Sequence, residues 1–170
     1  MRIDPDRHAP ELESIEQYLD FQRATMVLKT EGLTAEQMAI KSVASSDLTL
    51  GGLLYHLALV EESWLEVRFA GLAERPPWIG IDWDADPTWE FRTSADLTPD
   101  QLRQRYEEAC ERSRQVVANA TGPDQLSVAA NRDGVHFTLR WVLLHLIEET
   151  ARHAGHADFL REAIDGVTGE

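Results

Sequence analysis

The sequence contains very little cysteine and few basic residues. Cys110 is the only cysteine among 170 residues, which excludes an internal disulfide and a cysteine-based zinc cluster. Any metal site must therefore be built from histidine, aspartate and glutamate. Only 16 Lys and Arg stand against 30 Asp and Glu, which gives a formal net charge of −14. This charge argues against nucleic acid or an anionic membrane surface as a partner, because both attract clustered positive charge.

Long apolar runs are also missing. No stretch approaches the roughly 20 residues of a membrane-spanning helix, and the first residues lack the charged-then-apolar pattern of a signal peptide. We therefore expect a soluble, cytoplasmic protein without a membrane partner. The length and the 43% hydrophobic content suffice for one core, so residues 1–170 are expected to form a single domain.

Four long segments carry apolar residues at the spacing of amphipathic helices. Their ranges are about 11–30, from Asp47 or Thr49 to about 70, about 98–120, and 139–162. The face of the second segment includes His56, Trp64 and Val67. Capping patterns at Thr34 and Thr98 predict the starts of a short helix over 35–41 and of the third long helix. Four long amphipathic helices predict an all-α fold, a four-helix bundle.

The connections between these segments differ in character. Residues 71–97 hold three tryptophans and three prolines without a sustained period, which predicts a long ordered loop of the kind that forms lids or binding segments or packs over the end of a bundle. Residues 121–134 are expected to be a connection with a turn at Asp133 and Gly134.

The fourth segment places a carboxylate and an imidazole on the stripe that should face the core. Glu149 and His153 are four residues apart and therefore share one helix face. A buried carboxylate needs a positive partner, and a divalent metal ion is the simplest candidate. His56, on the apolar face of the second segment, is expected to supply a third ligand from across the core. Three such ligands leave open coordination positions for water or a substrate thiolate, as in catalytic sites.

Two further histidines of the fourth segment, His145 and His156, project toward the edge of this stripe. Either is a candidate proton carrier, an alternative ligand or a residue that supports a ligand. His145 can equally have a structural or capping role. His156 can replace His153 as the ligand, although the spacing from Glu149 favours His153.

Each of these assignments has a plainer alternative. His56 alone is compatible with a hydrogen-bonded core histidine, and Glu149 with a buried acid paired to Arg152 or Arg140. The tryptophans can line a substrate pocket, but aromatic residues more often fill the core or pack loops; they are Trp64, Trp78, Trp83 and Trp89. Cys110 is assigned no function.

Two segments carry a family resemblance. TLGGLLYHLALVEESWL (residues 49–65) and LRWVLLHLIEETARHAGHADFLRE (residues 139–162) resemble the paired signatures of the DinB-like superfamily, specifically its DUF664 branch. The resemblance implies an up-down-down-up four-helix bundle with a long crossover connection. It also implies a divalent metal ion held by His56, Glu149 and His153, and homodimers are common in the superfamily.

Many superfamily members have three histidines as ligands, whereas this chain is similar to the mycothiol-dependent maleylpyruvate isomerase in having glutamate at the middle position. A carboxylate suits zinc but also manganese or nickel. Members with assigned activities are largely metal-dependent transferases or isomerases that use thiols such as mycothiol or bacillithiol.

The sequence therefore predicts a metal-dependent thiol S-transferase or related detoxification enzyme. Its partners would be a low-molecular-weight thiol such as mycothiol and an electrophilic substrate, with His145 or His156 carrying the proton and Trp64 contacting the thiol. The alternatives are a metal-dependent hydrolase and a metal-binding or dimerisation module without turnover.

Overall fold

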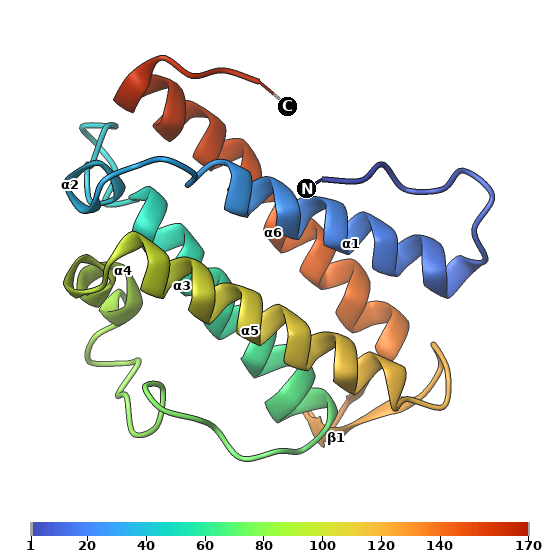
Figure 1. Cartoon of the computed structure of the whole chain (residues 1–170). Coiled ribbons are helices and arrows are strands. Elements are labelled where there is room, and N and C mark those ends of the chain that lie inside the picture. Colours follow the sequence, from blue (N-terminus) through green and yellow to red (C-terminus); the bar gives the residue numbers. More distant parts are fainter. Residues whose placement is uncertain (1, 170) are drawn as a thin grey trace.

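The computed structural model describes residues 2–169, and most of them are helical (Figure 1). The long helices are α1 (Glu11–Leu28), α3 (Leu50–Glu61) with its π-helical continuation η1 (Glu62–Phe69), α5 (Pro99–Ala118) and α6 (Leu139–Asp165). The short elements are α2 (Ala35–Met38), α4 (Trp89–Thr93), the 3₁₀ turn η2 (Ser94–Asp96) and the strands β1 (Leu126–Ala130) and β2 (His136–Thr138). The predicted helical class is confirmed, but a small hairpin accompanies the helices.

The long helices lie side by side. Helices α1 and α6 run in one direction in Figure 1, and α3 and α5 run in the other. Helix α6 packs against α1 and α3, and α3 also packs against α5. The pairing of α3 with α6 brings together the two segments from which ligands were predicted.

Threonine side chains begin four of the helices. Thr34 forms the predicted capping box with Gln37, and Thr98, which was predicted as an N-cap, forms a capping box with Gln101. Thr49, rather than Asp47, caps α3 by accepting a hydrogen bond from the backbone of Gly52, and Thr138 caps α6 in the same way. Each hydroxyl satisfies a backbone N–H that has no partner within the helix.

The second long helix changes its hydrogen-bond pattern halfway along. From Glu62 it is π-helical, with bonds such as the one from the amide of Ala70 to the carbonyl of Leu65. The wider turn alters which side chains face the core. Leu65 and Phe69 are buried, whereas Trp64 and Val67, which the α-helical period placed on the core face, are only half-buried. The predicted face is therefore wrong beyond Glu61.

The two connections hold more structure than the sequence predicted. The crossover 71–98 contains α4 and η2, and α4 packs against α3. In the second connection, β1 pairs antiparallel with β2, so that Leu126 lies opposite Thr138 and Ala130 opposite His136. The strands are too short for alternation to reveal them, and only the turn at 133–134 was visible in the sequence. Within residues 2–169, no helix is both long and apolar enough to cross a membrane.

Candidate metal centre

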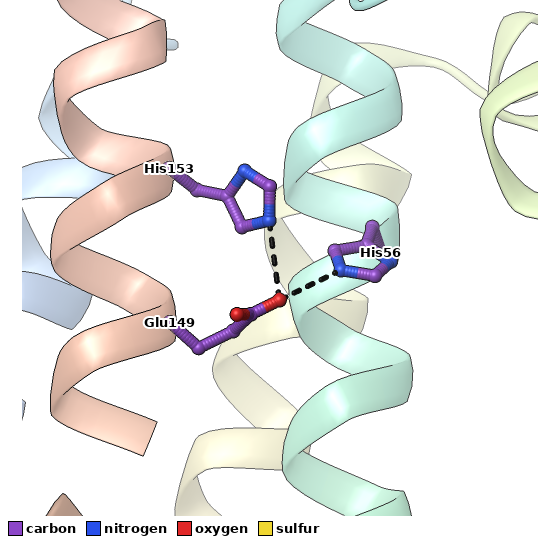
Figure 2. Close-up of side chains that lie close together, drawn as sticks. All are labelled: His56, Glu149 and His153. Carbon is purple, nitrogen blue, oxygen red and sulfur yellow. Dashed lines mark hydrogen bonds and ion pairs between the residues drawn. The ribbon is translucent and has the colours of Figure 1, made fainter. Parts of the chain in front are cut away.

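Three side chains from α3 and α6 converge where the two helices face each other (Figure 2). The Nε2 atom of His56 lies 3.4 Å from Oε1 of Glu149. The Nε2 atom of His153 lies 3.3 Å from the same oxygen. One potential ligand atom from each residue lies within 4.8 Å of the others. The structure thus brings together the three residues predicted as ligands, and metal binding by them stays a prediction.

The group sits at the edge of the core rather than at its centre. The side chain of His56 is 20% exposed, that of Glu149 17% and that of His153 12%. The neighbouring Leu146, Thr150 and Ala154 of α6 are buried and hold the helix against the core. The three polar side chains are consequently fixed by packing but remain reachable from solvent.

The arginines considered as partners of Glu149 are mostly engaged elsewhere. Arg140 pairs with Glu11 and Asp124. Arg152 pairs with Glu148, and its Nη1 atom lies 3.8 Å from Oε2 of Glu149. Because the Arg152 side chain is 57% exposed, this contact is screened by water. The ion-pair alternative thus survives only as a long, exposed contact with Arg152, and the imidazoles are the closer neighbours of Glu149.

The three side chains of the group shift one another's pKa values. Burial raises the pKa of Glu149, but the two histidines outweigh burial and the pKa is lowered. Burial lowers the pKa of His56, but hydrogen bonds to Glu90 and Glu149 outweigh it and the pKa is raised. Burial and the nearby charge of His56 lower the pKa of His153. The arrangement favours an ionised carboxylate with a positive charge beside it, and a divalent cation meets the same requirement.

Sequence reasoning missed one residue of the site. Glu90 of α4 is 4% exposed, and its Oε1 atom lies 3.0 Å from Nδ1 of His56. Its other oxygen, Oε2, is buried and has no hydrogen-bond partner within residues 2–169. No periodic pattern marks Glu90, because it lies in the crossover and meets His56 only through the tertiary fold.

The two additional histidines of α6 occupy different positions. His156 is exposed and lies behind His153, with 3.2 Å between their Nδ1 atoms, so it is not part of the convergent group. His145 lies one turn before Glu149 and stacks on Trp141, with ring centroids 5.2 Å apart. Burial lowers the pKa of His145. Their predicted catalytic roles are not tested by these positions.

Trp64 belongs to an aromatic cluster beside His145. Its ring lies 4.6 Å from that of His145 and contacts Phe137 and Trp141, and the guanidinium of Arg68 lies 4.6 Å from its centroid. The tryptophans of the crossover form a separate cluster around Tyr55, made of Trp78, Trp83 and Trp89. A cavity of about 660 Å³ between α1 and α5 is lined by none of the three predicted ligands.

Comparison with known proteins finds one matching family and two solved structures of similar fold. Residues 14–166 match the model of the Mycothiol-S-transferase family. The fold resembles the crystal structures of the mycothiol-dependent maleylpyruvate isomerase and of a histidine-to-alanine mutant of it, each with a TM-score of 0.62 and 14% sequence identity. Each likeness covers 98% of this chain and 65% of the isomerase chain, so this chain spans less than two thirds of the isomerase's length. No curated protein matches the sequence.

Proposed function

Because this chain belongs to the Mycothiol-S-transferase family, we propose that it is a metal-dependent enzyme that joins the sulfur of mycothiol to an electrophilic substrate. The proposed ligands of the metal ion are His56, Glu149 and His153. The proposed scaffold is one domain, an up-down-down-up four-helix bundle, and the opposite directions of the α1/α6 and α3/α5 pairs in Figure 1 support it.

The observation that carries the proposal is the convergence of one carboxylate and two imidazoles at the solvent-accessible edge of the core. Their potential ligand atoms lie within 4.8 Å of one another. This donor set fits zinc, and it also suits nickel or manganese. Three protein ligands leave positions for a further molecule, and the partial exposure of all three side chains gives that molecule access. Both features argue against a sealed, purely structural site.

The chemistry needs an ionised thiol near neutral pH. A divalent ion, when bound, lowers the pKa of a thiol that coordinates it. His145 is suited to accept the thiol proton, because burial keeps its pKa below the ordinary histidine value and leaves the ring neutral near pH 7. Trp64, at contact distance from His145, is proposed to contact the bound thiol.

His156 lies at a different position from His145. It approaches the nitrogen of His153 that faces away from Glu149, and this is the position of a group that orients a ligand histidine. We therefore propose His145 rather than His156 as the proton acceptor.

The test combines metal analysis with an activity assay. Untagged protein is analysed for bound metal and then assayed, after metal loading, with mycothiol and an aryl halide. We expect about one ion per chain. We also expect thioether formation, in which the thiolate displaces the halide, so that one halide ion and the thiol proton are released per thioether. Both the ion and the reaction should be lost in His56→Ala and His153→Ala. Glu162→Gln is the matched control, because Glu162 is an exposed carboxylate of the same helix outside the convergent group, and it should retain both.

Other outcomes decide against the proposal. Metal binding with hydrolysis of an ester probe, but no thioether, would assign the site to a hydrolase. Metal binding without either reaction would leave a metal-binding module. Absence of metal after loading would leave Glu149 an ordinary half-buried acid.

A further inference from the structure

The contact between Glu90 and His56 goes beyond the ligand set itself. Glu90 is part of α4, in the crossover that joins the two halves of the chain, and it approaches His56 from the side opposite to Glu149. Its Oε1 atom lies 3.0 Å from Nδ1 of His56, whereas Glu149 lies 3.4 Å from Nε2. The imidazole is therefore held between two carboxylates.

The chemistry of the carboxylate determines where the hydrogen sits on the ring. An ionised carboxylate only accepts hydrogen bonds, so a bond to Glu90 requires a hydrogen on Nδ1 of His56. This holds whether the ring is neutral or charged. By the same rule Glu149 calls for a hydrogen on Nε2, so the charged ring bonds both carboxylates. The neutral ring has one hydrogen, and the shorter contact, 3.0 Å to Glu90 against 3.4 Å to Glu149, favours it on Nδ1. The lone pair is then on Nε2, the nitrogen that faces Glu149 and His153 (Figure 2).

We propose that Glu90 is a positioning residue that fixes His56 in the Nδ1–H tautomer and so presents Nε2 as a metal ligand. The inference rests on the proposed metal site, because the unprotonated Nε2 of His56 would be the atom that binds the metal ion. Glu90 is not itself a ligand: it contacts Nδ1 of His56, the nitrogen that does not face Glu149, and it is outside the convergent group.

The packing of α4 supports this role. Phe91, the next residue, stacks on the His56 ring with centroids 5.3 Å apart and an interplanar angle of 22°. Gly52 lets α4 come this close, because a Cβ atom there would lie 2.7 Å from Cδ1 of Phe91. The ring of His56 is thus held in position by Phe91 and oriented by Glu90.

The first measurement is the tautomer of His56 in metal-free protein. Long-range ¹H–¹⁵N correlation spectra of labelled protein, recorded where histidines are neutral, report which ring nitrogen carries the hydrogen; His56→Ala identifies the signals. We expect the Nδ1–H form in the wild type and a mixture containing Nε2–H in Glu90→Ala. The shape-preserving Glu90→Gln should fold as the wild type does and shift the tautomer less.

The second measurement is metal affinity, determined by competition with a chromogenic zinc chelator. Loss of a carboxylate that supports a metal-ligating histidine typically weakens affinity about 10–100-fold, and we expect this in Glu90→Ala, with a smaller loss in Glu90→Gln. Asp96→Asn is the control, since Asp96 is an exposed carboxylate of the same crossover.

The two readouts separate this inference from the proposed function. An unchanged tautomer in both Glu90 variants would overturn the positioning role, even if stability fell. An altered tautomer with unchanged zinc affinity would also overturn it. If the Glu90 variants alter the tautomer but the wild type binds no zinc, Glu90 does orient His56 and the proposed metal site is contradicted.

Discussion

Glu61 and Glu149 lie on neighbouring helices, and their surroundings differ. Glu61 of α3 is 1% exposed and accepts hydrogen bonds from Nε and Nη2 of Arg23, at 2.7 Å and 2.6 Å. Glu149 of α6 has only imidazoles nearby and a long contact to an exposed arginine. The first carboxylate has its own cation within the protein, and the second faces groups that suit an external cation. Burial of an acid alone therefore does not indicate a metal site. The identity of the neighbouring groups and their distance from the carboxylate determine whether it needs an external cation.

The largest expected difference comes from removing each carboxylate charge in metal-free protein. Glu61→Gln leaves the buried guanidinium of Arg23 with only the part-exposed Asp20 as counter-charge and should lower the free energy of unfolding by about 3–5 kcal/mol. Glu149→Gln removes only weak hydrogen bonds to histidines and should cost about 1 kcal/mol. Urea unfolding at neutral pH measures both. Equal losses would show that the two environments are equivalent.

Addition of metal should stabilise the protein through the Glu149 site and not through the Glu61–Arg23 pair. Zinc at about 100 times its dissociation constant should raise the free energy of unfolding of the wild type by about 2.7 kcal/mol. Thermal unfolding should show little of this gain in His153→Ala and all of it in His8→Ala, a histidine outside the site. Full stabilisation of His153→Ala would place the metal elsewhere.

Two helical glycines offer a matched test of how α4 reaches the site. Gly52→Ala should destabilise the fold by about 1–3 kcal/mol and weaken zinc binding, because the added methyl group overlaps Phe91. Gly155→Ala has open space around its Cβ and should stabilise α6 by up to about 1 kcal/mol. Changes of the same sign, measured by urea unfolding, would contradict the close approach of α4.

The smallest expected effect concerns acid stability near Arg23. Burial raises the pKa of Asp20, but hydrogen bonds to Arg114 and Arg23 outweigh it and lower the pKa below its ordinary value. The stabilisation is present above the unfolded-state pKa and is lost as pH falls through the folded-state value. Asp20→Asn should be slightly less stable than the wild type at neutral pH, and the gap should close in strong acid. A gap that widens in acid would reverse the sign of the shift.

The site was only partly predictable from the sequence. The four-residue spacing of Glu149 and His153 placed them on one helix face, and the structure bears out their proximity to His56. The prediction put them on the central stripe, whereas they lie at its edge. Glu90 escaped prediction because its partner is 34 residues away and its own segment has no regular period.

The fold, like the site, was predicted only in part from the sequence. Apolar spacing located the long helices, and a capping pattern marked the start of α5, because both act over three or four residues. The face of the second helix was wrong beyond Glu61, since the change to π-helical bonding has no counterpart in an α-helical pattern. The hairpin was also missed, because its strands of five and three residues are stabilised by pairing with each other.

The sequence by itself determined the long helices, some of their capping residues and the residue types of the candidate metal ligands, because composition and short-range periodicity express them. Only the tertiary structure decided that Arg23 neutralises Glu61, that Glu149 meets two histidines instead, and that Glu90 reaches His56. These pairings join residues on different elements. They depend on how helices pack and on how closely a crossover can approach, which no local pattern records.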